Sequence, residues 1–143
     1  MKIFYAVFDT NVLVSSLMSK RKDSPTVALL DYVLDGQIVL LYSEEIVAEY
    51  DEVLRREKFE FSDERINAVL EMVKTGFCLE PTPSGLSFPD ADDSVFYEVA
   101  LSKEGSYLVT GNQKHFPKTP IVVTPAEMLQ IVQNENLTND PKP

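Results

Sequence analysis

Short apolar runs alternate along the chain with segments of helical period. The runs are continuous and rich in β-branched and aromatic residues, and they span residues 3–8, 38–42, 77–79, 107–109 and 121–123. Continuous apolarity is typical of strands that are buried on both faces, as in a parallel sheet. We therefore predict a mainly parallel sheet of about five strands, each with both faces covered.

Signals for helix starts stand between these runs. Ser43 and Ser62 each precede a segment with apolar residues at helical spacing, and a capping box opens a last helix at Thr124. Alternating strands and helices with short connections predict an α/β fold, a three-layer α/β/α sandwich. We assign residues 1–132 to a single domain and expect the polar residues 133–143 to form a frayed tail.

Composition limits the chemistry that this chain can perform. It has 143 residues, a formal net charge of −10, one cysteine (Cys78) and one histidine (His115). These counts exclude an internal disulfide, a cysteine-based zinc site and a histidine-rich metal site. No apolar run approaches the roughly 18 residues of a membrane span, and the N-terminus lacks a signal-peptide pattern, so we expect a cytoplasmic protein with no membrane partner. The shortage of basic residues argues against a broad basic face for nucleic acid.

Small polar turns end two of the expected strands. Asp9 directly follows the first strand, and Thr110 and Asn112 follow the fourth. Parallel sheets place ligands at the carboxyl ends of their strands, where Thr110 and Asn112 could fix a metal-bound water or a phosphate. Asp9 is equally a favoured helix N-cap, and a Gly-Asn pair is ordinary turn chemistry. These residues alone leave both interpretations open.

Two expected helices carry further acids. Helical angles place Glu49 on the flank of an apolar face centred on Tyr50, so its carboxylate is the one on that helix expected to look inward. The next acidic group opens the helix that runs to Ala100, where Asp90 suits the N-cap and two more acids fill the first turn. Geometry does not choose between Asp92 and Asp93 as the inward carboxylate.

Acids from separate elements that meet at one sheet edge need a cation. Two carboxylates about 5 Å apart repel by roughly 3 kcal/mol at an effective dielectric near 20. An all-oxygen site suits Mg²⁺ or Mn²⁺. A hard divalent ion beside an open cleft is typical of phosphodiester hydrolysis, because the ion activates a water and neutralises charge on the phosphate.

Several stretches together resemble the PIN-domain family, in its branch of toxins from toxin–antitoxin systems. They read FDTNVLVSSL, SEEIVAEYDEVLRREKF, PDADDSVFYEVALSKEGSYLVTGNQKHFP and VVTPAEML, and the resemblance covers about Ile3 to Leu129. It implies a metal-dependent ribonuclease with a Rossmann-like fold. It also implies Asp9, Glu49 and Asp93 as catalytic metal ligands, which selects Asp93 over Asp92 by analogy.

The resemblance extends to the residues around these acids. It implies Thr10, Asn11, Asp92 and Thr110 as supporting residues. The fourth catalytic position holds Asn112, where many PIN domains carry an acid, and His115 stands where others carry a second Asp. An amide contributes no charge, so we expect one tightly bound ion, with a second arriving with the substrate phosphate.

The function that this implies is an endoribonuclease, the toxin of a type II toxin–antitoxin system. Its partners would be an RNA substrate, a cognate antitoxin protein and a possible homodimer. The alternatives are a catalytically impaired PIN scaffold that binds RNA or a partner protein, and a phosphotransfer domain, whose sequence patterns fit less well.

Two basic clusters are the candidates for contacts to RNA. They contain Lys20, Arg21 and Lys22 in one case and Arg55 and Arg56 in the other, although either cluster can equally be a solvated helix end. The acidic balance then predicts weak, salt-sensitive RNA binding that depends on a divalent metal.

Overall fold

The structure is a computed structural model, and it describes residues 1–139. The strands and helices in chain order are β1 (Phe4–Phe8), α1 (Thr10–Met18), α2 (Pro25–Leu34), β2 (Ile38–Tyr42), α3 (Glu44–Leu54), α4 (Asp63–Lys74), β3 (Phe77–Cys78), α5 (Ser94–Leu101), β4 (Tyr107–Val109), β5 (Val122–Val123) and α6 (Pro125–Asn139). Three short 3-10 turns lie between them: η1 (Glu57–Phe59), η2 (Ala91–Asp93) and η3 (Gln113–His115).

The five strands form one parallel sheet. Their order is β3-β2-β1-β4-β5, and each of the four neighbouring pairs is parallel. The chain builds outward from β1 to β3 and then returns to the other side of β1 with β4. Such a reversal opens a crevice at the carboxyl ends of β1 and β4, the two central strands between which the order reverses. Ligands bind at this place in open α/β sheets.

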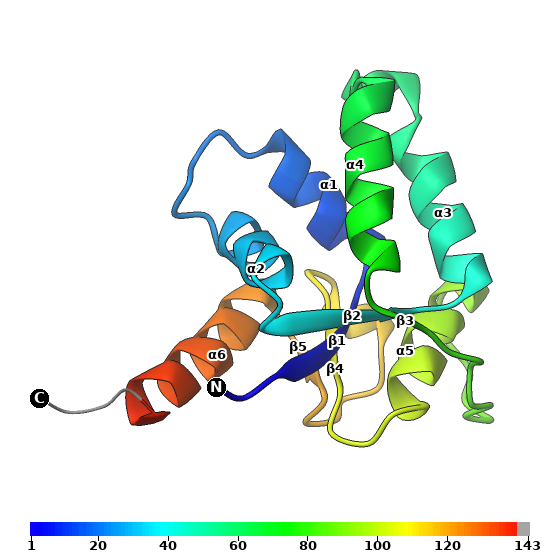
Figure 1. Cartoon of the computed structure of the whole chain (residues 1–143). Helices are drawn as coiled ribbons and strands as arrows, with labels where there is room; N and C mark the ends of the chain where they lie inside the picture. Colours follow the sequence, from blue (N-terminus) through cyan, green and yellow to red (C-terminus); the bar gives the residue numbers. More distant parts are fainter. Residues whose placement is uncertain (140–143) are drawn as a thin grey trace, which may run out of the picture.

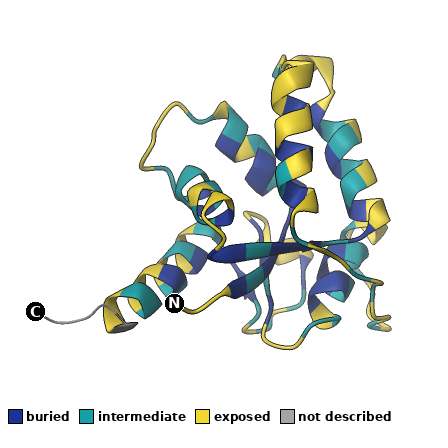
Figure 2. Cartoon of the chain, in the orientation of Figure 1, coloured by how far each residue is buried: buried dark blue, intermediate teal, exposed yellow. Residues whose placement is uncertain are grey.

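Helices cover both faces of this sheet, as the sequence predicts. Helix α5 packs against β1, β2 and β4, whereas α1, α2 and α4 pack against β1 or β2 from the opposite side (Figure 1). Helix α6 lies against α2. Buried residues concentrate in the sheet and on the helix faces turned toward it (Figure 2), so the three-layer α/β/α prediction is confirmed.

Helix α3 stands at the end of the sheet and connects both helical layers. It contacts α1 and α4 on one side and α5 on the other. Ser43 caps it by accepting a hydrogen bond from the backbone of Ile46, which fixes where the helix begins. This position brings the side chains of α3 to the carboxyl end of β1. In the described part of the chain, every helix is too short or too polar to cross a membrane.

Strand β3 departs from the expectation that each strand is buried on both faces. Phe77 is 52% exposed, and Cys78 is exposed as well. The strand has two residues and lies at the edge of the sheet, where β2 is its one partner among the described residues. The continuous apolar run therefore predicted the place of this strand in the chain correctly and its burial wrongly. Such a run does not show whether a strand is central or lies at the edge of the sheet.

Helix α6 also corrects the expected polar tail. Residues 133–139 are helical, whereas the sequence places them in a frayed segment. Val132 is fully buried, and the Asn136 side-chain amide donates a hydrogen bond of 3.1 Å to Gln37, which is itself 1% exposed. This amide pair ties the end of the helix to the start of β2. The rest of the expected tail, residues 140–143, lies outside the described residues.

The amide pair gives a stability prediction. Asn136→Ala leaves the side-chain oxygen of the buried Gln37 without this donor, so the free energy of unfolding should fall by about 1–3 kcal/mol. Urea denaturation followed by circular dichroism measures the change. The matched control is Asn134→Ala on the same helix, which removes only an exposed hydrogen bond from Gln130 and should change stability by less than about 0.5 kcal/mol. Equal denaturation midpoints for the two variants would contradict the role of the pair.

Candidate active site

Asp9 is the central residue of the site. It follows β1 at the N-cap position of α1 and is only 7% exposed, yet its side chain makes no capping bond to the helix. Its Oδ2 instead accepts hydrogen bonds from Thr110 Oγ1 at 2.7 Å and from Asn11 Nδ2 at 3.2 Å. Thr110 follows β4, so this contact spans the crevice between the two central strands. Helix capping therefore does not account for Asp9.

A further hydrogen bond joins the turn after β1 to the turn after β4, and another lies within the turn after β4. The Asn11 side-chain oxygen accepts from the Gly111 amide at 3.2 Å, and Thr110 Oγ1 accepts from the Asn112 amide at 2.9 Å. Thr110 is fully buried. Its hydroxyl therefore donates to a carboxylate and accepts from the backbone, which fixes its rotamer and, through it, the orientation of Asp9.

Glu49 joins the site from α3. Its side chain is half-buried, and Oε2 accepts a hydrogen bond from the Thr10 hydroxyl, the residue that follows Asp9. The next residue on the helix, Tyr50, is 1% exposed and donates its hydroxyl to the Phe8 carbonyl oxygen. Two consecutive side chains thus anchor α3 to the end of β1. The helical angle had correctly indicated Glu49 as the inward acid.

Asp93 completes the group from η2, just before α5. The side chain of Asp93 is 15% exposed, whereas Asp92 is exposed, and Asp90 caps the turn by accepting from the Asp92 amide at 3.0 Å. The three acids of this segment therefore occupy three different places, and Asp93 is the inward one. Its Oδ2 lies 3.3 Å from Nδ1 of His115 on η3.

The inward carboxylates are electrostatically strained. Burial raises the pKa of Asp9, Glu49 and Asp93, and it is the largest cause for each. The negative charges of Asp9 and Asp93 raise the pKa of Glu49 further, and Asp9 raises that of Asp93. Hydrogen bonds from Thr110 and Thr10 act in the opposite direction on Asp9 and Glu49. The three groups therefore interact as one unit that a cation would stabilise.

The donor chemistry of this unit fits a hard divalent ion. Carboxylate oxygens are the ligands that Mg²⁺ and Mn²⁺ prefer, and Asp9, Glu49 and Asp93 supply them. Within residues 1–139, however, no group of three or more His, Cys, Asp or Glu side chains is arranged closely enough to hold an ion. Mg²⁺ commonly uses one or two carboxylates and keeps several waters, so such a loose set remains compatible with it.

Other expected residues stand apart from the acids. Asn112 is exposed, and its side chain makes no hydrogen bond to the described part of the chain. The arginines of the two basic clusters are engaged in ion pairs: Arg21 with Asp23 at 3.1 Å, Arg55 with Asp51 at 2.7 Å and Asp63 at 3.0 Å, and Arg56 with Glu52 at 3.1 Å. These arginines are therefore less available to phosphate than the sequence suggests.

Sequence reasoning missed two residues at the site. His115 contacts Asp93, and the sequence marks it only as the residue that stands where other PIN domains carry a second Asp. Tyr50 was recognised as an apolar position, but its hydroxyl bond to Phe8 has no sequence signal, because the partner is a backbone carbonyl far along the chain.

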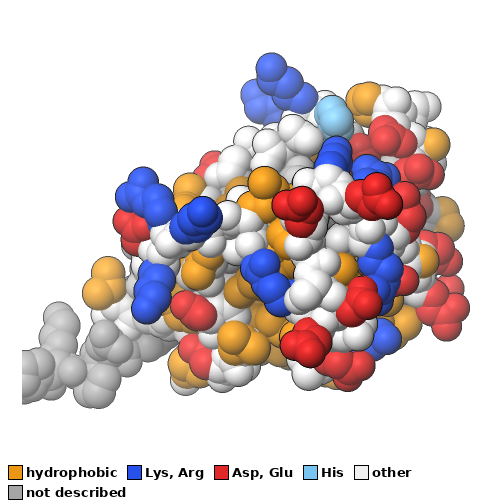
Figure 3. All heavy atoms as spheres, turned by 90° about the horizontal axis from the view of Figure 1, so that it is seen from above, with side chains coloured by type: hydrophobic (Ala, Val, Ile, Leu, Met, Phe, Trp, Pro, Cys, Tyr) orange, Lys and Arg blue, Asp and Glu red, His pale blue; other side chains and the backbone are white. Residues whose placement is uncertain are grey.

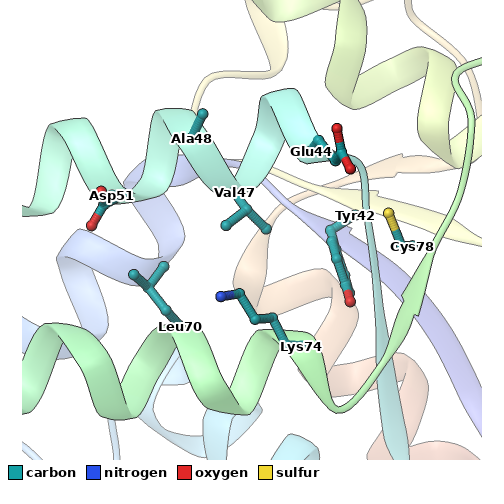
Figure 4. A pocket seen from close by; sticks show the side chains of 8 residues that line it. All are labelled: Tyr42, Glu44, Val47, Ala48, Asp51, Leu70, Lys74 and Cys78. Atoms are coloured by element: carbon teal, nitrogen blue, oxygen red, sulfur yellow. The ribbon is translucent and has the colours of Figure 1, made fainter.

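A groove of about 580 Å³ opens beside the acids, between α3 and the segment that leads into α5. Its lining includes Glu49, Asp92 and Arg56. A second hollow of about 600 Å³ lies between α3 and α4, where Val47 points toward Leu70 and Lys74 (Figure 4). The second hollow contains none of the three inward acids, so the groove beside Glu49 is the better candidate for the substrate path.

Comparisons with known proteins identify the family and the fold. The family model described as PIN domain matches residues 5–114. A solved structure, "Crystal structure of PAE2754 from Pyrobaculum aerophilum", is similar with a TM-score of 0.58 and 16% sequence identity, covering 92% of this chain and 90% of that chain. At this identity the likeness shows the fold. The search of curated proteins gave no significant match.

The buried acid gives a pH-dependent prediction in metal-free buffer. Burial raises the pKa of Asp9 above its ordinary value of 3.8. Between this ordinary value and the raised value, the folded state therefore binds more protons than the unfolded state. Stability from this group is therefore present at low pH and lost as pH rises through the folded pKa. Asp9→Asn should be more stable than the wild type by about 0.5–2 kcal/mol near pH 7, and the gain should shrink toward about pH 4.

Urea denaturation at a series of pH values in EDTA measures this difference. The control is Asp31→Asn on α2, where the side chain is exposed and the expected change is below about 0.5 kcal/mol. A stability difference between Asp9→Asn and the wild type that stays constant with pH would contradict the interpretation.

Proposed function

Because the chain belongs to the PIN domain family, whose members are generally nucleases, we propose that it is a metal-dependent endoribonuclease. The observation that carries the proposal is the meeting of three inward carboxylates, from the turn after β1, from α3 and from η2, at the crevice between β1 and β4. Inward acids with raised pKa values lower the stability of a fold, so their presence together at a ligand-binding edge favours a catalytic role.

Asp9, Glu49 and Asp93 would hold Mg²⁺ or Mn²⁺. A bound divalent ion supplies neutralisation of phosphate charge and activates a water for attack. The chain's own contribution is orientation. Thr110 and Asn11 hold Asp9, and Thr10 holds Glu49, so that the carboxylates face the crevice before a ligand arrives.

The finer assignment is a toxin of a type II toxin–antitoxin system acting in the cytoplasm. It is supported by the resemblance of four stretches of the sequence, from FDTNVLVSSL to VVTPAEML, to that branch of PIN domains. The partners proposed with it are an RNA substrate, an antitoxin protein and a second copy of the chain in a homodimer.

A second candidate is a PIN scaffold that binds RNA or a protein without cleaving it. Asn112 favours this alternative, since it adds no charge and its side chain makes no hydrogen bond to the acids. The loose disposition of the acidic side chains among the described residues points the same way. Activity of the wild-type protein separates the two candidates.

Glu49→Gln tests the proposal, because it removes one charge and keeps the shape of the side chain. Cleavage of a labelled single-stranded RNA in Mg²⁺ should fall by about 100-fold or more, since even outer partners of metal ligands are worth about 10–100-fold. Asp9→Asn and Asp93→Asn should act alike. The same Glu49→Gln chain, expressed in bacteria, should no longer arrest growth if the wild type does.

The matched control is Glu71→Gln, an exposed acid on α4, which should cleave at the wild-type rate. EDTA should stop cleavage by the wild type. If purified wild-type protein binds RNA but leaves it intact in Mg²⁺ and in Mn²⁺, the scaffold is the better description. If Glu49→Gln and Glu71→Gln cleave equally well, Glu49 has no catalytic role.

A further inference from the structure

One long segment of this acidic chain contains no acid. All 23 Asp and Glu residues lie outside the segment from Gly105 to Ala126, which instead carries Lys114, His115 and Lys118. Elsewhere in the chain acids outnumber bases, and the total charge is −10. The segment itself therefore carries net positive charge in a chain that is negative overall.

This segment leads directly away from the acids. It contains β4, η3 and β5, and its Thr110 bonds to Asp9 while its His115 contacts Asp93. On the face seen from above, the single histidine lies between Lys or Arg side chains and a group of Asp and Glu side chains (Figure 3). Lys114 is next to His115 in the chain, so positive charge begins where the acidic site ends.

The two lysines of the segment are available to a ligand. Lys114 and Lys118 are both exposed, and neither forms an ion pair with an acid in residues 1–139. The arginines of the clusters that the sequence singles out differ in this respect, since Arg21, Arg55 and Arg56 are each paired with an acid. A phosphate can therefore contact these lysines without first breaking an ion pair with an acid.

Two hollows flank the loop that carries these lysines. One of about 450 Å³ is lined by Lys114, Lys118 and Thr119, and one of about 260 Å³ is lined by Lys114, His115 and Phe88; both share Phe116 and Pro117. The Thr119 hydroxyl is buried and has no hydrogen-bond partner in the described residues. The loop thus presents cations above hollowed, partly apolar surfaces, as surfaces that bind single strands do.

We propose that single-stranded RNA next to the scissile phosphate lies along residues 113–119, with Lys114 and Lys118 contacting backbone phosphates. This inference rests on the proposed function and names where its substrate binds. An RNA strand is favoured over an acidic protein segment because Lys114 stands next to His115, which contacts one of the acids that would act on a phosphodiester. Lys20 and Lys22 lie beyond the end of α1, whose nine residues extend about 13 Å from the site, so they are expected to contribute less.

The test compares Lys114→Ala/Lys118→Ala with Lys20→Ala/Lys22→Ala, which removes the same charge. Fluorescence polarisation with a labelled single-stranded RNA of about 12 nucleotides measures binding. The affinity for RNA falls as salt rises, and loss of two phosphate contacts should make this fall of log affinity with log salt shallower by about 1.4. The advantage of the wild type over the variant in affinity should therefore shrink about sevenfold between 50 and 200 mM salt. In the cleavage assay, KM should rise while kcat stays near that of the wild type.

The comparison of the two lysine variants can overturn the proposed RNA-binding surface in three ways. Wild-type affinity and salt slope in Lys114→Ala/Lys118→Ala, or a larger loss in Lys20→Ala/Lys22→Ala, would overturn the inference. Unchanged RNA binding with lost binding of a poly-glutamate peptide would assign the surface to an acidic protein and also overturn it. If the wild type binds RNA without cleaving it, the proposed function fails, and the same lysine comparison still decides whether the surface exists.

Discussion

The buried contact between Thr110 and Asp9 is the interaction on which the site depends. It joins the ends of β1 and β4 across the crevice where the strand order reverses, and it orients a carboxylate that is only 7% exposed. Thr10 and Asn11 follow Asp9 in sequence and extend this contact to Glu49 and to the β4 turn. The parallel sheet therefore acts as the frame that brings acids from three distant segments together.

Placing these carboxylates together at the end of the sheet lowers the stability of the fold. Burial raises the pKa of Asp9, Glu49 and Asp93, and repulsion by neighbouring carboxylates raises those of Glu49 and Asp93 further. Hydrogen bonds from the Thr110 and Thr10 hydroxyls offset only part of the effect on Asp9 and Glu49. The protein carries this strain on a rigid support, since Tyr50 fixes α3 to the end of β1 below the carboxylates. Strained groups on a well-packed frame are typical of sites where a ligand supplies the missing interaction.

The sequence predicted the fold because parallel strands and capped helices leave local patterns. Glu49 was predicted for the same reason, since it lies in a regular helix. Asp93 could not be separated from Asp92 by helical angles, because both residues lie in a 3-10 turn and α5 begins only at Ser94. The exposure of β3, the length of α6 and the ion pairs of the arginines depend on tertiary neighbours, which no local pattern reports.

The central claim is that these acids together bind a divalent ion. Isothermal titration calorimetry with Mn²⁺ on the metal-free wild type and on Glu49→Gln tests it without any assumption about the substrate. The account predicts saturable binding to the wild type and binding at least about tenfold weaker to Glu49→Gln. Equal affinities for the two proteins, or no binding to the wild type, would contradict it.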